Sequence, residues 1–262
     1  MLDIEGSWTD ALPMVLAADS PAPPSESYVI QGQVVRLPVI VRDASSVFAS
    51  FVVPTAAVRK VLPPGLQPAE LLPGRTLCSL AGIEYRDNDL GRYNEVAVAF
   101  IVREGRDAAL PMVDLVRGRV GAYIHHLPVT ESFTCAAGST IWGFPKTIEQ
   151  ISITEEDGRR ICKLMMGGAH VLTLSVKASG RWRFRDAPVT AFSYRGGIVR
   201  RTPFVSGGEG VGYRLGGAAL TLGAHPLADE LRSLGLPKHA LMSGSVNKMR
   251  ARFEAPQVVA IA

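Results

Sequence analysis

The sequence predicts a mainly β (α+β) fold, in which one barrel or curled sheet carries a few helices. Three observations favour this class. Glycine and proline supply 26 and 18 of the 262 residues, an excess that is typical of chains with many turns. Apolar segments rich in β-branched residues recur along the chain, and Gly, Pro or Asp clusters separate them. These segments do not alternate regularly with helical ones, which disfavours a doubly wound parallel sheet.

The first 30 residues are expected to form a flexible arm, followed by a single domain at residues 31–262. Residues 18–27 combine Ser, Pro, Asp and Glu, a composition that is typical of coil. Helices are expected at residues 55–62, 129–139 and 226–234, the last because leucines recur there at helical spacing. Strands are expected at residues 33–41, 47–53, 75–85, 94–102, 120–126, 147–154, 159–166, 170–177, 198–205, 211–222 and 248–254.

The positive charge of the chain is concentrated near its C-terminal end. The whole chain has a net charge of +4, whereas residues 181–262 alone hold 12 basic and 5 acidic side chains. Arg181, Arg183 and Arg185 alternate with two aromatic residues, so a strand would place the arginines on one face. Because no nucleic-acid-binding motif accompanies them, we expect a basic surface strand and no nucleic-acid partner.

Several features favour a soluble cytoplasmic protein. The longest uninterrupted apolar run, residues 96–102, is far shorter than the ~20 residues that cross a bilayer. Acidic residues stand at the N-terminus, where a secretory signal carries positive charge. The three cysteines are widely spaced and do not suggest a disulfide framework. Since CxxC and HExxH motifs are absent, we expect no metal, no cofactor and no membrane partner.

Lys146 is a candidate catalytic residue because of its apolar sequence neighbours. It is the only lysine in the segment IWGFPKTI, residues 141–148. An ammonium group in an apolar pocket has a lowered pKa, and the free amine is the form that attacks a carbonyl to give a Schiff base. The alternative is a surface lysine whose aliphatic stem covers the aromatic rings.

Glu95 is the second candidate catalytic residue. Alternation along residues 93–102 places Glu95 and Ala97 on one strand face and larger apolar side chains on the other. Two apolar faces are typical of a central strand, and the small alanines leave room for a ligand. Burial raises the pKa of a carboxyl group and suits it to carry a proton. The alternative is a structural carboxylate paired with Arg92.

Together these segments resemble the acetoacetate decarboxylase family. The likeness rests on the motifs Tyr93-Asn94-Glu95, Tyr123-Ile124-His125 and Trp142-Gly143-Phe144-Pro145-Lys146. It extends over roughly residues 33–260, through AVRKVLP at residues 57–63 and a small-residue turn at residues 243–245. The Gly-Phe-Pro-Lys element with a preceding Tyr-x-Glu is its most specific part.

The resemblance implies a cone-like antiparallel β-barrel with peripheral helices, assembled as a homo-oligomer. It also implies that Lys146 forms the Schiff base and that Glu95 lies near the substrate. The further candidate substrate-binding residues are Tyr93, Trp142, Phe144, His126 and Arg42.

Three positions depart from the family pattern. Thr147 stands where the family's decarboxylases carry a second lysine. A pocket acid falls on Leu80, and Glu84 would replace it only after a shift of four residues. A substrate-facing arginine falls near Ala44, and Arg42 would replace it after a shift of two, which preserves the strand face. These departures imply an altered substrate.

Two further motifs carry weaker signals. The adjacent His125 and His126 would face opposite ways on a strand, so we do not expect them to bind a metal together. The glycine-rich residues 207–212 lack the spacing of a dinucleotide-binding motif and predict a mobile loop.

The function that these observations favour is a Schiff-base-forming lyase acting on a small keto acid. In its first form the enzyme decarboxylates a β-keto acid other than acetoacetate itself. In the alternative form it is an aldolase–dehydratase of secondary metabolism that acts on a 2-oxo acid such as pyruvate. An alternative of another class is a non-catalytic β-barrel that binds a small ligand.

Overall fold

The computed structural model describes residues 26–105, 120–178 and 180–259. Most of the predicted N-terminal arm lies outside these residues. The last residues assigned to it form strand β1 (Ser27–Ile30), which pairs with β2 (Gln33–Arg36) in a hairpin. In the part of the chain that is described, no helix has both the length and the apolar character needed to span a bilayer.

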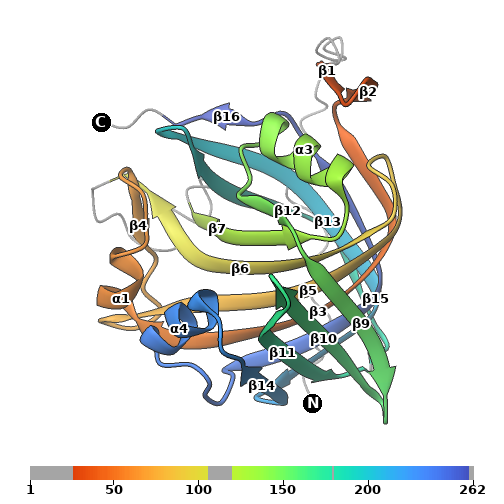
Figure 1. Ribbon diagram of the computed structural model, residues 1–262. Coiled ribbons are helices and arrows are strands. Elements are labelled where there is room, and N and C mark those ends of the chain that lie inside the picture. Colours follow the sequence, from red (N-terminus) through yellow and green to blue (C-terminus); the bar gives the residue numbers. More distant parts are fainter. Residues whose placement is uncertain (1–25, 106–119, 179, 260–262) are drawn as a thin grey trace, which may run out of the picture.

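Seven long strands close into a barrel, which confirms the predicted mainly β class (Figure 1). They follow one another around the barrel in the order β6, β5, β3, β15, β13, β12 and β7, and pairing of β6 with β7 closes it. One difference from the expected antiparallel barrel is that β7 and β12 are parallel. The seven strands are β3 (Val39–Pro54), β5 (Arg75–Asn88), β6 (Tyr93–Glu104), β7 (Val120–Val129), β12 (Trp182–Arg195), β13 (Ile198–Leu215) and β15 (Met242–Phe253).

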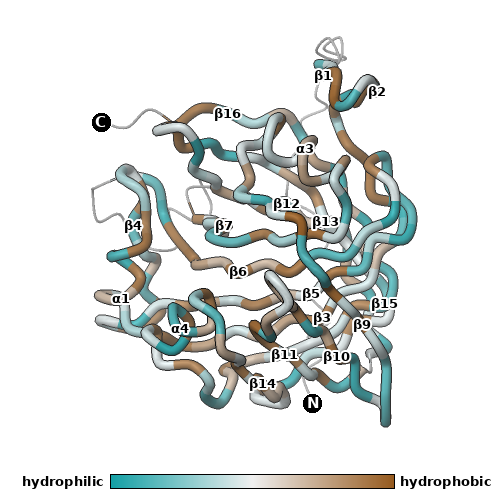
Figure 2. The backbone as a smooth tube through the Cα atoms, viewed as in Figure 1, coloured by the Kyte–Doolittle hydropathy of each residue, from teal (hydrophilic) through white to brown (hydrophobic). Residues whose placement is uncertain are grey.

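A second, antiparallel sheet covers part of the outer wall of the barrel. Its strands follow the order β14 (Ala218–Leu222), β11 (Ala169–Lys177), β10 (Arg159–Met166) and β9 (Gln150–Glu156). An apolar core fills the space between this sheet and the barrel, and α1 (Thr55–Arg59) and α4 (Pro226–Ser233) border it. In Figure 2 the projecting hairpin of β9 and β10 is hydrophilic at its tip, where it leaves that core.

Inside the barrel a separate apolar cluster lies under helix α3 (Ser132–Ile141), which crosses one end of the barrel in Figure 1. The short strand β8 (Lys146–Ile148) follows α3 and pairs with β7. The remaining short strands, β4 (Leu66–Pro68) and β16 (Gln257–Val258), pair with β6 and β13. The barrel wall therefore separates two apolar cores, an outer core beneath the second sheet and an inner core beneath α3. The predicted catalytic residues lie on the side of the inner core.

Several predicted elements are correct in kind but differ in extent. The helix expected at residues 129–139 begins at Ser132, because Val129 is still paired with β6 and β8. The strand expected at residues 147–154 divides into β8 and β9.

The mobile loop expected at residues 207–212 is wrong, because these residues continue strand β13. They pair with β15, so residues 198–215 form one strand. A Cβ atom on Gly208 would lie 2.6 Å from the side chain of Val246, and one on Gly207 would lie 2.1 Å from the Asp186 carboxylate. The glycines therefore allow close packing within the sheet, whereas the sequence pattern alone suggested a turn.

Candidate active site

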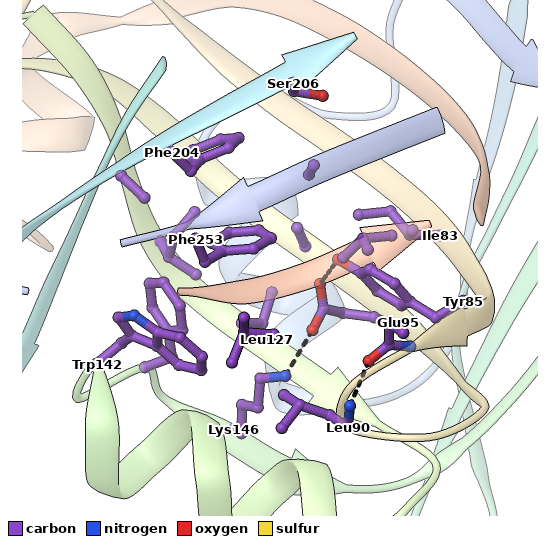
Figure 3. A pocket seen from close by; sticks show the side chains of 18 of the residues that line it. Ile83, Tyr85, Leu90, Glu95, Leu127, Trp142, Lys146, Phe204, Ser206 and Phe253 are labelled. Atoms are coloured by element: carbon purple, nitrogen blue, oxygen red, sulfur yellow. Dashed lines mark hydrogen bonds and ion pairs between the residues drawn. The ribbon is translucent and has the colours of Figure 1, made fainter. Parts of the chain in front are cut away.

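A cavity of about 240 Å³ lies inside the barrel beneath α3. Its wall is almost entirely apolar, and Figure 3 shows aromatic side chains from β13, β15 and the turn after α3 gathered on one side. Small side chains of the barrel strands leave this space open, since Ala97, Ala122, Ala191 and Ala251 all line it. Lys146 and Glu95 are the two residues with ordinarily charged side chains among the described residues of the lining.

The turn between α3 and β8 positions Lys146. Helix α3 ends at Ile141, and the backbone N–H groups of Trp142 and Phe144 both donate to the carbonyl of Gly138. Gly143 then adopts a φ of 66°, in the region that favours glycine. The chain enters β8 at Lys146, whose side chain lies next to the helix and extends toward Glu95 (Figure 3).

Two residues one helical turn apart on α3 contact the Lys146 side chain. The Nζ atom donates a hydrogen bond to the Thr134 hydroxyl at 3.2 Å. Gly138 lies against the stem, and a Cβ atom there would be only 2.5 Å from Lys146 Cε. Glycine at this position therefore makes room for the lysine under the helix.

Lys146 and Glu95 form a buried ion pair. Lys146 Nζ lies 2.8 Å from Glu95 Oε2, and the two side chains are 4% and 7% exposed. The Tyr85 hydroxyl donates to the other carboxylate oxygen at 3.2 Å. The ring of Tyr93 stacks on that of Tyr85 and lies 5.0 Å from the ammonium group. The carboxylate is thus held by a tyrosine on one side and faces the lysine on the other.

The ion pair changes the protonation expected for Lys146. Burial lowers the pKa of the lysine, as the sequence suggested, but the charge of Glu95 and its hydrogen bond outweigh burial and raise the pKa above its usual value. The expected net depression is therefore wrong, because a carboxylate lies in direct contact. Burial and the neighbouring Glu95 also raise the pKa of Tyr85 well above its usual value, so its hydroxyl remains a proton donor.

The structure brings together five of the predicted site residues. Tyr93, Trp142 and Phe144 line the cavity with Lys146 and Glu95. Trp142 is held in place by a hydrogen bond from its indole Nε1 to the carbonyl of Glu254, at 2.9 Å.

Arg42 lies on the outside of the barrel, and the structure does not bring it to the cavity. Val41 and Ala44 both face the inner core, because β3 is irregular between these two residues. Arg42 therefore does not share the inward face of Ala44 and turns outward. There it pairs with Asp87 at 2.8 Å and with Asp89 at 2.6 Å. Glu84 is also turned away from the cavity and pairs with Arg86 at 3.5 Å.

Thr147, His126 and Leu80 also lie outside the lining of the cavity. Thr147 is exposed on β8, since it faces away from Lys146 on the strand, and Leu80 is buried in the core outside the barrel. His126 contacts Glu230 of α4 at 3.3 Å. The expectation that the two adjacent histidines face opposite ways is wrong, because both contact Glu230.

Sequence reasoning missed several residues of the site. Tyr85 could have been found from strand alternation, because Ile83 and Tyr85 face the cavity from the strand next to Glu95. Thr134 and Gly138 have the four-residue spacing of one helix face. Phe204 and Phe253 carried no local signal. They meet only because β13 pairs with β15, where their rings stack 4.8 Å apart.

Comparison with known proteins agrees with this architecture. The sequence profile of the acetoacetate decarboxylase (ADC) family matches residues 21–260. Acetoacetate decarboxylase from Legionella pneumophila subsp. pneumophila str. Philadelphia 1 superposes with a TM-score of 0.63, at 18% identity over 93% of each chain. The enduracididine biosynthesis enzyme MppR, complexed with pyruvate, gives 0.58 at 17% identity, over 86% of this chain and 91% of its own. Among curated proteins, none matches the chain in sequence.

Proposed function

Because the chain belongs to the acetoacetate decarboxylase family, we propose that it is a lyase that binds the ketone of a small keto acid as an imine on Lys146. The observation that carries this proposal is the buried pair of Lys146 and Glu95 at 2.8 Å in an apolar cavity. A primary amine and a proton carrier in contact are the two groups that imine chemistry requires.

The first step of the proposed reaction is a proton transfer within the pair. Lys146 is protonated in the free protein, and only the neutral amine attacks a carbonyl. Glu95 Oε2 accepts this proton directly, while Tyr85 holds the other carboxylate oxygen. A substrate that excludes water favours the transfer, because it converts two buried charges into two neutral groups.

Glu95 then returns the proton during imine formation. The amine adds to the ketone carbon, and the protonated carboxyl group supplies the proton with which the hydroxyl leaves as water. The resulting iminium cation accepts the electron pair of the bond between the adjacent carbon and the carboxylate of a β-keto acid. Carbon dioxide leaves, and Glu95, after taking up a proton from solvent, protonates the enamine on carbon. Water then hydrolyses the re-formed iminium, which releases the ketone and restores the ammonium form of Lys146.

The cavity wall favours a substrate with an apolar or aromatic portion. The rings of Phe204, Phe253, Trp142 and Phe144 contact one another in sequence along the cavity, and the adjoining strands add aliphatic side chains. Thr147 is exposed on β8, so this chain has no second ammonium group beside Lys146 on that strand. We therefore propose a keto acid larger than acetoacetate.

An aldol reaction followed by dehydration is the second candidate. It is favoured by structural likeness to MppR, which has been seen with pyruvate and with the condensation product of pyruvate and imidazole 4-carboxaldehyde. In that reaction Glu95 would remove a proton from the methyl group of a pyruvate iminium. The enamine would then attack an aldehyde, and the aromatic side of the cavity would accommodate the ring of that partner.

Borohydride trapping tests the proposal. The full-length protein is incubated with borohydride and pyruvate, acetoacetate or a larger aryl keto acid, and its peptides are mapped by mass. We expect the reduced adduct on Lys146, its loss in Lys146→Ala, and its retention in Lys163→Ala, which alters an exposed lysine. Adducts on Lys60 or Lys163 would overturn the assignment. Ligand binding without any adduct or turnover would instead support the non-catalytic barrel.

A further inference from the structure

His125, His126 and Glu230 form a second polar cluster, on the opposite side of the barrel wall from the cavity. His125 Nε2 lies 2.5 Å from Glu230 Oε1, and His126 Nε2 lies 3.3 Å from Glu230 Oε2. Each carboxylate oxygen thus faces one imidazole. The three groups are the one set of His, Cys, Asp or Glu in the described chain whose ligand atoms converge, all within 4.8 Å of one another.

A β-bulge directs both histidines to the same side of β7. Val98 of β6 pairs with His126 and the next residue, Ala99, pairs with Ile124, which leaves His125 as the extra residue. A bulge places two consecutive residues opposite one, so the usual alternation is interrupted. Ile124 and Leu127 on either side both line the cavity, while both imidazole rings point outward to α4.

Helix α4 holds the carboxylate over this bulge. Leu227 and Leu231 bury one face of the helix in the outer core, and His225 caps its N-terminus by accepting the N–H of Leu227. Glu230 is adjacent to Leu231 in the helix, so its side chain lies at the edge of the buried face, where it contacts both histidines. Its side chain is 28% exposed, between 14% for His125 and 33% for His126. The cluster is anchored by the core and still open to solvent.

We propose that His125, His126 and Glu230 bind a first-row divalent metal ion, with zinc(II) as the best fit. Two neutral imidazoles and one carboxylate are a common three-ligand set for zinc, which leaves a fourth position for water. Zinc bonds of ~2.0–2.1 Å place the atoms of a tetrahedral ligand set about 3.3 Å apart. The ligand atoms of the three residues, one from each, lie within 4.8 Å of one another, so side-chain movements must bring them closer to reach this spacing.

The surroundings favour nitrogen and oxygen ligands over a thiolate. Cys78 lies in the same outer core, but burial raises the pKa of its thiol to about 12 and it is not among the convergent groups. The His125 ring is held by Phe100 and Tyr123, at 5.4 Å and 6.0 Å between ring centroids. Imidazole ligands also disfavour magnesium and calcium, which prefer oxygen.

Metal titration of the full-length protein tests this site independently of the proposed lyase activity. After removal of metal with EDTA, the protein is titrated with zinc(II) by calorimetry and with cobalt(II) by visible absorption. We expect one equivalent to bind, with the d–d bands of tetrahedral cobalt and no thiolate charge-transfer band. Zinc should also raise the unfolding temperature, because it binds the folded state.

Variants identify the ligands. Glu230→Gln and His126→Gln should each weaken zinc binding by more than the roughly 10–100-fold loss typical of an outer-shell partner. Both should abolish the zinc-dependent rise in unfolding temperature. His170→Gln is the matched control, since His170 contacts Thr173 on β11 and lies outside the cluster.

Two results would overturn the site. One is the absence of stoichiometric binding by the wild type, which would leave Glu230 as a purely structural partner of the histidines. The other is undiminished affinity in both variants, which would place the metal elsewhere. Circular dichroism in EDTA establishes whether each variant is folded. If His126→Gln is not folded, Glu230→Gln, which keeps the size of the side chain, alone tests whether the cluster binds the metal.

Discussion

At the Lys146–Glu95 pair, burial and charge pairing act in opposite directions on the same proton. Burial disfavours both the ammonium and the carboxylate, whereas their contact at 2.8 Å favours both. A buried pair of this kind contributes little net stability, since the desolvation of two ions offsets their attraction. What the pair provides is a proton that can move from nitrogen to oxygen when the surroundings become drier. The chemistry of the site therefore depends on Glu95 as much as on the lysine.

Glu95→Gln separates these two contributions. Turnover should fall by about 10²–10⁴-fold, the range for a lost acid–base group. Imine trapping at Lys146 should largely survive, because without the carboxylate the amine is no longer held in its protonated form, and solvent can supply the proton with which the hydroxyl leaves. Since Glu95 raises the pKa of the lysine, its removal leaves burial to lower that pKa, and trapping should extend to lower pH than in the wild type. The measurement is the trapping rate against pH, beside steady-state turnover. Turnover within a factor of two of wild type would return Glu95 to a structural role.

Among the elements, α3 and the turn to β8 form the part that presents the nucleophile. The helix supplies Thr134 as a hydrogen-bond acceptor and Gly138 as a gap for the lysine stem. The same glycine carbonyl accepts hydrogen bonds from two residues of the turn. Gly138 therefore contacts the end of the helix, the turn and the lysine, and a larger side chain at this position should displace Nζ of Lys146.

Gly138→Ala tests that dependence. Alanine favours a helix interior by about 0.8–1 kcal/mol over glycine, yet its Cβ would lie 2.5 Å from Lys146 Cε. Overpacking of this kind costs about 1–3 kcal/mol, so we expect a net loss of stability in denaturant unfolding. Displacement of Nζ by about 1 Å should slow trapping by roughly 10²-fold. Thr140→Ala, at an exposed position of the same helix, should leave trapping unchanged. Faster or equal trapping in Gly138→Ala would contradict this account of the helix.

On the scale of the whole molecule, the barrel separates two tasks. Outward-facing residues of its wall pack against the second sheet and α4, and this outer core contributes to stability. Inward-facing positions beneath α3 include four alanines, which leave a cavity where a close-packed barrel would have none. Because the outer core stabilises the barrel strands, the interior of the barrel can contain a cavity for a substrate.

The size of that cavity predicts substrate preference. Acetoacetate should be decarboxylated weakly, and a larger, apolar or aromatic keto acid should react better. Ala97→Leu fills part of the 240 Å³ cavity and should reduce kcat/KM for the larger substrate by about 10–200-fold, the range for one misfitting methylene. Trapping of pyruvate should change less. Carbon dioxide release from acetoacetate at ordinary enzymatic rates by the unmodified protein would show that Thr147 does not mark a changed substrate.

Exposed apolar side chains on β12 and β13 predict self-association. Trp182, Phe184 and Tyr213 are 64%, 43% and 45% exposed, and the rings of Phe184 and Tyr213 lie 5.1 Å apart. Apolar groups gathered on a surface are typical of interfaces. Light scattering should give the mass of an oligomer for the wild type and a smaller mass for a double change, Trp182→Ser with Phe184→Ser. Val29→Ser, at an exposed position of the β1–β2 hairpin, serves as the control. A wild type of single-chain mass would contradict this expectation.

Local sequence was sufficient for the class of the fold and for most of its strands, and the resemblance to a known family selected Lys146 and Glu95 as the two central residues of the candidate site. Alternation along β6 predicted that Glu95 shares a strand face with small alanines, whereas the apolar neighbours of Lys146 left both a buried and a surface lysine open. Only the tertiary structure decided that these two side chains touch, which reverses the direction of the lysine's pKa shift. It also decided that Arg42 faces outward and that a bulge turns His125 and His126 to the same side. Those outcomes depend on which strands pair and in what register, and pairing joins residues too distant in sequence for any local pattern to specify.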